Sequence, residues 1–171
     1  MVGFEVEARK NLSEHHQYLR GITVGANYTW LESEISVGTL ESDLDGAGTR
    51  PLVGQSPYLF NFDITYNNSS LGLTTSIFYN IYGERLDSVS LSTGKNSEGL
   101  NTGPPNIYEQ PVGTLDFMFS KELKENWKLK FTAKNLLDPA VKKTYSYKGE
   151  EYVFSLYNRG RSYSLSFDYS F

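Results

Sequence analysis

The stretch that decides the fold is Ser162-Tyr163-Ser164-Leu165-Ser166-Phe167-Asp168-Tyr169-Ser170-Phe171. Every odd-numbered position carries a large apolar side chain, and every even-numbered position carries a small polar or acidic one. Successive side chains of a β-strand point to opposite faces, so this strand would have one apolar face and one polar face. Such alternation predicts a strand whose two faces meet different surroundings.

Six more segments alternate in the same way, and no segment shows helical periodicity. The connections between several neighbouring segments are short enough for antiparallel hairpins. The sequence therefore predicts an all-β, antiparallel fold of about seven strands. Besides residues 162–171, the predicted strands lie at residues 2–9, 22–30, 58–66, 71–81, 114–120 and 127–134.

Short and long connections alternate along the chain. The short ones are residues 11–17, 67–70 and 121–126, and the long ones are residues 33–56, 83–110 and 138–159. Transmembrane barrels have this asymmetry, with tight periplasmic turns and large external loops. The apolar stripes cover about 9–11 residues, the length that a tilted strand needs to cross hydrocarbon. We therefore predict an antiparallel transmembrane β-barrel segment.

The last long connection contains a further pattern. Residues 142–147 and 151–157 are rich in tyrosine and flank Lys148-Gly149-Glu150, which suits a tight turn. We predict a hairpin here that lies outside the membrane and extends the last two wall strands. An ordered external loop is the alternative.

Composition narrows the function. The 171 residues carry a net charge of -4 and no cysteine, which argues against nucleic acid as a partner and excludes disulfides and thiolate metal sites. The adjacent His15 and His16 cannot face one ion from a strand, and the acidic run that ends at Asp45 lacks the glutamate of an EF-hand loop. No nucleophile and base are spaced for catalysis. We predict no enzyme activity, no catalytic residue, no metal site and no cofactor.

The strand count predicts an incomplete barrel. Bacterial single-chain barrels normally have an even number of strands, whereas about seven are predicted here. Two unpaired edges in lipid would leave backbone groups unsatisfied, at several kcal/mol each. We expect residues 1–171 to be a partial C-terminal portion of a larger barrel, with the rest of the wall before Met1.

Two motifs resemble those of TonB-dependent outer-membrane receptors. The first is Asn135-Leu136-Leu137-Asp138 at the end of a strand, and the second is Asn158-Arg159-Gly160-Arg161-Ser162-Tyr163 before the alternating terminal strand. The resemblance is strong over residues 109–171 and generic before them. It implies the bacterial cell outer membrane and a plugged barrel of about 22 strands. This chain would supply about seven of those strands, with the plug domain absent.

The resemblance also implies a function and partners. A receptor-transporter of this kind takes up a scarce nutrient, such as an iron chelate, a cobalamin-like compound or a glycan. Its partners would be outer-membrane lipid, the TonB complex through the missing plug, and an unknown small ligand bound with help from residues 33–56 and 83–110. A small passive barrel or porin is the alternative, and a soluble β-sandwich is a more distant one.

Two sets of residues are singled out as candidate sites. The spaced apolar residues of the terminal strand resemble a signal read by the outer-membrane assembly machinery, although they would face lipid in any case. The motif residues have a structural interpretation, in which Asn135 and Asp138 end the strand and Pro139 prevents its continuation. The assembly set is Leu165, Phe167, Tyr169 and Phe171, and the family-motif set is Asn135, Leu136, Leu137, Asp138, Gly160 and Arg161.

Overall fold

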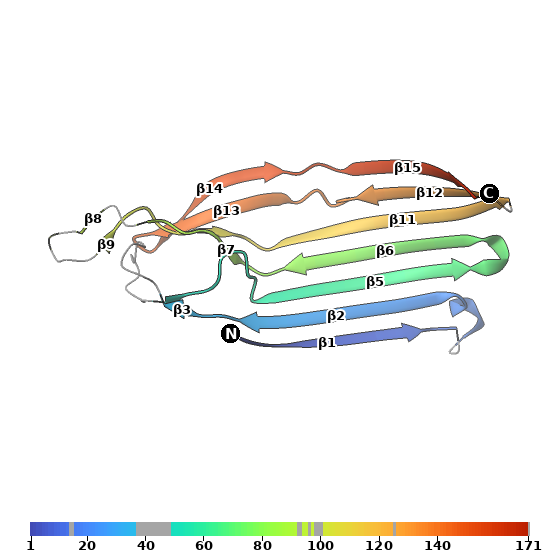
Figure 1. Cartoon of the computed structure of the whole chain (residues 1–171), viewed down its shortest axis with the longest axis horizontal. Coiled ribbons are helices and arrows are strands. Elements are labelled where there is room, and N and C mark those ends of the chain that lie inside the picture. Colours follow the sequence, from blue (N-terminus) through green and yellow to red (C-terminus); the bar gives the residue numbers. More distant parts are fainter. Residues whose placement is uncertain are drawn as a thin grey trace.

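The computed structural model describes residues 1–13, 16–36, 49–91, 94–95, 97, 101–124 and 126–170. Seven strands form one antiparallel sheet, the large sheet (Figure 1). Their order in the sheet is the same as their order along the chain, so each pairs with the next of the seven. This confirms the predicted all-β antiparallel fold and all seven predicted wall strands. The strands are β1 (Val2–Asn11), β2 (Ile22–Glu32), β5 (Tyr58–Asn68), β6 (Leu73–Tyr82), β11 (Val112–Lys124), β12 (Trp127–Lys134) and β15 (Ser162–Tyr169).

A second, four-stranded sheet, the small sheet, lies beyond one end of the large sheet (Figure 1). Its order is β14 (Glu150–Asn158), β13 (Ala140–Tyr147), β10 (Ile107–Glu109) and β7 (Arg85–Ser88). The hairpin predicted at residues 142–157 is confirmed as β13 and β14. Two short ribbons pair β3 (Ile35–Ser36) with β4 (Thr49–Arg50), and β8 (Gly94–Lys95) with β9 (Asn101–Thr102).

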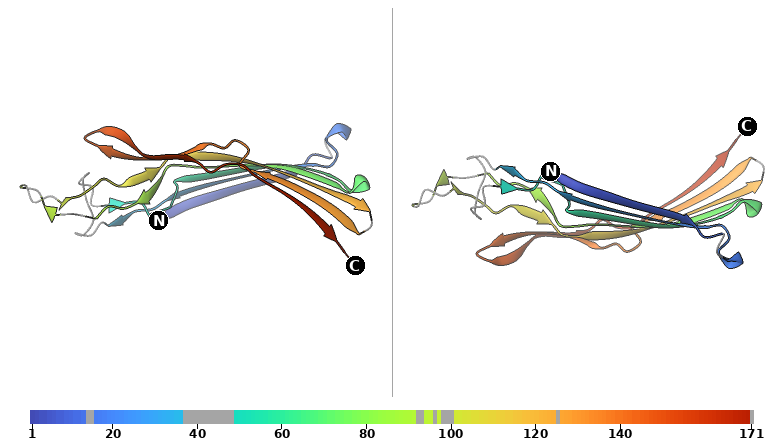
Figure 2. Two further views of the ribbon diagram at one scale, coloured as in Figure 1. Left: turned by 90° about the horizontal axis from the view of Figure 1, so that it is seen from above. Right: turned by 90° about the horizontal axis from the view of Figure 1, so that it is seen from below.

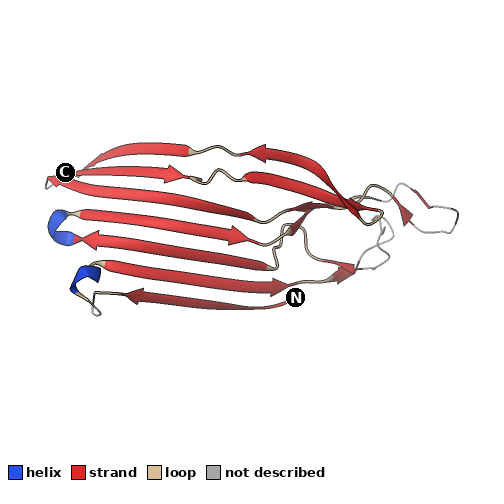
Figure 3. Cartoon of the chain, turned by 180° about the vertical axis from the view of Figure 1, so that it is seen from behind, coloured by secondary structure: helices blue, strands red, loops and turns tan. Residues whose placement is uncertain are grey.

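The opposite end of the large sheet carries the short connections (Figure 3). Two of them contain 3-10 turns, η1 (Gln17–Leu19) and η2 (Ser69–Leu71). Asn68 closes η2 by accepting a hydrogen bond from the Leu71 amide at 3.1 Å, and Gly72 follows with a left-handed φ of 58°. β6 therefore begins at Leu73 and not at the predicted residue 71. No helix among the described residues has the length and apolar character to span a membrane.

β11 is longer than predicted. It continues to Lys124, so most of the connection expected at residues 121–126 belongs to the strand. The reason is that Lys121 and Glu122 remain paired with Leu129 and Lys128 of β12. Because both residues are charged, the sequence pattern alone suggests a turn at this position.

The large sheet is a single curved layer (Figure 2). Its register brings the predicted apolar sets onto one face, where Ile64 and Ile77 are directly paired and 38% and 44% exposed. Only four apolar side chains among the described residues are buried, those of Leu86, Val112, Ala133 and Val141. Within the described part of the chain no second sheet covers the apolar face, so the packing of a soluble sandwich is not observed.

Candidate functional site

The polar face of the large sheet carries a row of amide side chains. Asn27, Asn61 and Asn80 are directly paired across β2, β5 and β6. Asn80 Nδ2 donates to Asn61 Oδ1 at 2.6 Å, Asn61 Nδ2 donates to Asn27 Oδ1 at 3.4 Å, and Asn27 Nδ2 donates to Glu5 of β1. These hydrogen bonds link four neighbouring strands through side chains that would be unstable against lipid.

A salt bridge crosses the same face. Arg9 Nη2 lies 2.9 Å from Asp63 Oδ1, so the ion pair links β1 to β5 over the intervening strand β2. Gly25 of β2 lies beneath it, and a Cβ there would be only 2.5 Å from Asp63 Oδ1. A side chain at this position would therefore have to displace one of the two charged groups.

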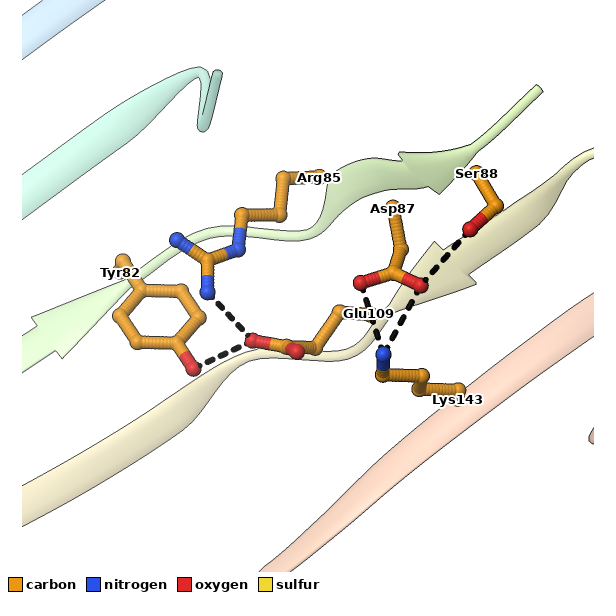
Figure 4. Close-up of polar contacts among 6 residues, drawn as sticks. All are labelled: Tyr82, Arg85, Asp87, Ser88, Glu109 and Lys143. Atoms are coloured by element: carbon orange, nitrogen blue, oxygen red, sulfur yellow. Dashed lines mark hydrogen bonds and ion pairs between the residues drawn. The ribbon is translucent and has the colours of Figure 1, made fainter. Parts of the chain in front are cut away.

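A cluster of charged residues lies where the large sheet meets the small sheet (Figure 4). Glu109 of β10 is 3% exposed, and its Oε1 accepts hydrogen bonds from the Tyr82 hydroxyl and Arg85 Nη2, both at 2.7 Å. The Arg85 guanidinium also lies over the Tyr82 ring, 4.4 Å from its centroid. A buried carboxylate with two donors is stable in its charged form.

The electrostatics of Glu109 follow from this geometry. Burial is the largest single influence and opposes ionisation, but the hydrogen bonds from Tyr82 and Arg85, with the charges of Arg85 and Arg159, outweigh it. The net result is a pKa of the Glu109 carboxyl below its ordinary value. The carboxylate is therefore ionised at neutral pH.

A second ion pair joins the outer hairpin to the cluster. Lys143 Nζ of β13 donates to both carboxylate oxygens of Asp87 at 2.8 Å, and Ser88 Oγ donates to the same carboxylate at 3.2 Å (Figure 4). The hydrogen bond to Asp87 raises the pKa of Lys143 despite some desolvation. β13 is thereby fixed to β7, although the two strands are separated by β10.

Arg85 also lines two hollows at this end of the sheet. One, of about 320 Å³, includes Thr29, Leu59 and Tyr82. The other, of about 400 Å³, includes Trp30 and Tyr108 in addition to Arg85. A small molecule entering either hollow would meet an arginine beside aromatic and aliphatic side chains.

The two C-terminal motifs contact each other. Asn135 Nδ2 donates to the Gly160 carbonyl at 2.7 Å, the Gly160 amide donates to Asp138 Oδ1 at 2.9 Å, and Arg161 Nε donates to the Leu136 carbonyl at 2.9 Å. The backbone amide of Asn135 donates to Asp116 Oδ1 at 2.8 Å. We call this set of hydrogen bonds the motif joint.

The hydrogen bonds of the motif joint differ from those predicted, in which Asn135 and Asp138 would bond to their own local backbone. Asn135 and Asp138 do adopt left-handed φ values of 56° and 45°, as turn residues do. Their side chains bond mainly across to the second motif, because β14 and β15 run beside β13 and β12. β12 ends at Lys134, and a separate strand, β13, begins at Ala140 directly after Pro139. Leu137 is exposed.

Three residues of the predicted assembly signal lie on β15, an edge strand of the large sheet. Leu165 and Phe167 are each 60% exposed on the apolar face, and Tyr169 lies 4.9 Å from Trp127 between ring centroids. Phe171 lies outside the described residues.

No group of three or more metal-ligating side chains occurs among the residues that the structure describes. His15 and the acidic run that ends at Asp45 lie outside that part of the chain.

The charged cluster was missed by sequence reasoning, which treated residues 83–110 as one external loop. Lys143 and Asp87 are 56 positions apart, and only the pairing of β7, β10 and β13 brings them together. The polar–apolar–polar order of Arg85, Leu86 and Asp87 is a local signal that fits a strand there.

Comparison with known proteins matches the chain to a protein family. A family model described as "TonB dependent receptor-like, beta-barrel" matches residues 2–136, which includes the first two residues of the first motif. No curated protein and no solved structure matches the chain.

Proposed function

Because this chain belongs to the TonB-dependent receptor-like β-barrel family, we propose that its large sheet is one sector of the wall of a closed outer-membrane barrel. Members of this family are transporters of the outer membrane and not enzymes. The observation that carries the proposal is the single-layer sheet with one apolar and one polar face. The apolar face suits lipid and the polar face suits a water-filled or plugged lumen.

The open edges of the large sheet support a larger barrel. Among the described residues, β1 pairs in this sheet with β2 alone and β15 with β12 alone. Unpaired strand edges are not stable in hydrocarbon, so both would pair with further wall strands. We propose that residues 1–171 are a C-terminal portion of a barrel of about 22 strands whose plug lies elsewhere in the protein.

The transported compound is a scarce nutrient in this proposal, with an iron chelate, a cobalamin-like compound and a glycan as candidates. The small sheet and the connections at residues 33–56 and 83–110 would form part of the ligand-binding region. The hollows beside Arg85 lie there and support this placement. The energy would come from the TonB complex through the plug, and the wall would carry out no covalent chemistry.

We also propose that the edge strand β15 is recognised by the outer-membrane assembly machinery. An unpaired edge offers backbone groups for strand addition, and Leu165, Phe167, Tyr169 and Phe171 offer spaced apolar anchors.

The function can be tested by uptake in cells that produce the full-length protein. Two variants would replace residues 37–48 or 89–106 with short Gly-Ser linkers, which leaves β7 and β10 in place. We expect at least one variant to lose uptake of one compound among iron chelates, cobalamin and glycans, while surface abundance stays normal. A TonB-deficient strain serves as the control and should also lose uptake. Uptake that is unchanged in both variants would contradict the assigned binding region, and uptake without TonB would favour a passive porin.

A further inference from the structure

We infer that β14 extends the closing seam of the barrel outside the membrane, where it pairs with the outer part of the same wall strand that pairs with β15. This inference rests on the proposed function, because it requires a closed barrel. The partner is thus a further segment of the same protein in extended conformation, and it is recognised through backbone hydrogen bonds and apolar side chains.

The first observation is the exposure of β14. In the part of the chain that the structure describes, it is the edge strand of the small sheet and pairs there with β13 alone. Phe154 and Leu156 are 58% and 63% exposed, and Val153 is exposed as well. Water-exposed edges are usually protected by charge or proline, because an apolar edge promotes aggregation. Residues 152–157 carry neither, so this edge has the character of a covered surface.

The second observation is alignment. β14 and β15 follow each other along one margin of the molecule, and β13 and β12 do the same immediately inside it (Figures 1 and 3). The segment between β12 and β13 and the segment between β14 and β15 are joined by the motif joint, through Asn135, Asp138 and Gly160. A neighbour that pairs with β15 is therefore directed along β14 when it leaves the membrane.

The alignment also sets the length of the partner. The seam runs from Glu150 to Tyr169, which is about 66 Å at about 3.3 Å per residue. The partner strand would therefore need about 20 residues, roughly twice the 9–11 that a tilted strand needs to cross the membrane. Its outer half would carry apolar side chains opposite Phe154 and Leu156.

Hydrogen exchange of the wild-type full-length protein, in detergent, tests the inference at the level of single amides. In an edge strand every second amide points away from the sheet and exchanges quickly. In a strand that is paired on both sides, the outward amides are protected too. We expect the outward amides at 151–157 to exchange about 100-fold more slowly than those of the Lys148-Gly149 turn.

The remaining outcomes separate the two proposals. Fast exchange at alternate positions of β14, with full protection of β15, would overturn the inference and leave the closed barrel intact. Alternating protection in β15 as well would remove the closed barrel itself. Protection of β14 that grows with protein concentration would assign the edge to a second copy of the chain, which also overturns the inference.

Discussion

Asn135 and Gly160 are 25 positions apart, yet the side-chain amide of Asn135 donates to the carbonyl of Gly160 at 2.7 Å. This contact joins the two C-terminal motifs at the place where two wall strands leave the large sheet. Asn135 also has a left-handed φ of 56°, so the residue combines a backbone role with a side-chain role. The two roles can be separated by substitution.

Replacing Asn135 with glycine should destabilise the full-length protein by about 1–3 kcal/mol, because the left-handed backbone is kept while the hydrogen bond to Gly160 is lost. Asn135→Ala should cost more, since alanine adds backbone strain at positive φ. The free energy of unfolding in detergent measures both effects. A glycine variant as stable as wild type would show that the side chain contributes nothing to the joint.

The Arg9–Asp63 salt bridge should be sensitive to Gly25→Ala. The new Cβ would be 2.5 Å from Asp63 Oδ1, so the carboxylate must shift and the salt bridge is weakened, at a cost of about 0–1 kcal/mol for such a partly exposed pair. In an Asp63→Ala background the same substitution should cost much less, because the obstructed carboxylate is gone. A double-mutant cycle of unfolding free energies checks this coupling. Additive costs would mean that the close approach over Gly25 does not matter.

Glu109 should make stability depend on acid pH. The pKa of its carboxyl is lowered in the folded protein, so the stabilisation is complete above the unfolded value and is lost as pH falls through the folded one. We expect Glu109→Gln to be less stable than wild type at neutral pH and the difference to shrink on acidification. Thermal unfolding between about pH 7 and pH 3 measures it. A difference that stays constant over this range would contradict the assignment.

Substituting Lys143 or its neighbour Lys142 with alanine removes the same charge from adjacent positions, so the two variants can be compared directly. Lys143 is partly buried against Asp87, whereas Lys142 and its partner Glu151 are largely exposed. Lys143→Ala should therefore loosen the β13–β14 hairpin and speed its proteolysis several-fold, while Lys142→Ala changes little, since exposed pairs contribute about 0–1 kcal/mol. Equal cleavage rates in the two variants would place the anchor of the hairpin elsewhere.

The two faces of the large sheet should respond differently to a new charge. Ile77→Arg puts a guanidinium on the apolar face and should cost about 2–4 kcal/mol in a lipid bilayer. Thr114→Arg puts the same group on the polar face of the adjacent strand and should cost far less. Folding yields into lipid vesicles provide the comparison. Similar losses for both variants would argue against lipid on the Ile77 side.

The sequence predicts the large sheet well because each predicted wall strand spans seven residues or more of alternating pattern. The terminal stretch from Ser162 to Tyr169 is found as β15 for that reason. Errors fall at strand ends, as at Leu71 and Lys124, where a 3-10 turn or continued pairing decides the boundary. Local polarity does not encode either feature.

The charged cluster could not be predicted in the same way. β7 and β10 have only four and three residues, too few for alternation to be recognised. The contact between Arg85 and Glu109 depends on which strands become neighbours beyond the end of the large sheet. The motif joint is an intermediate case, because its residues are recognisable as motifs but their mutual contacts require the pairing of β12 with β15.

The row of Asn27, Asn61 and Asn80 has a consequence for assembly. A slip of β5 by one position would turn the amide of Asn61 into hydrocarbon, and a slip by two positions would place it opposite Gly25 or Thr29 in place of Asn27. The first slip would leave the amide without a hydrogen-bond partner in lipid, and the second would break its hydrogen bond with Asn27. The row therefore favours the observed register of β2, β5 and β6 over registers that are shifted by one or two positions.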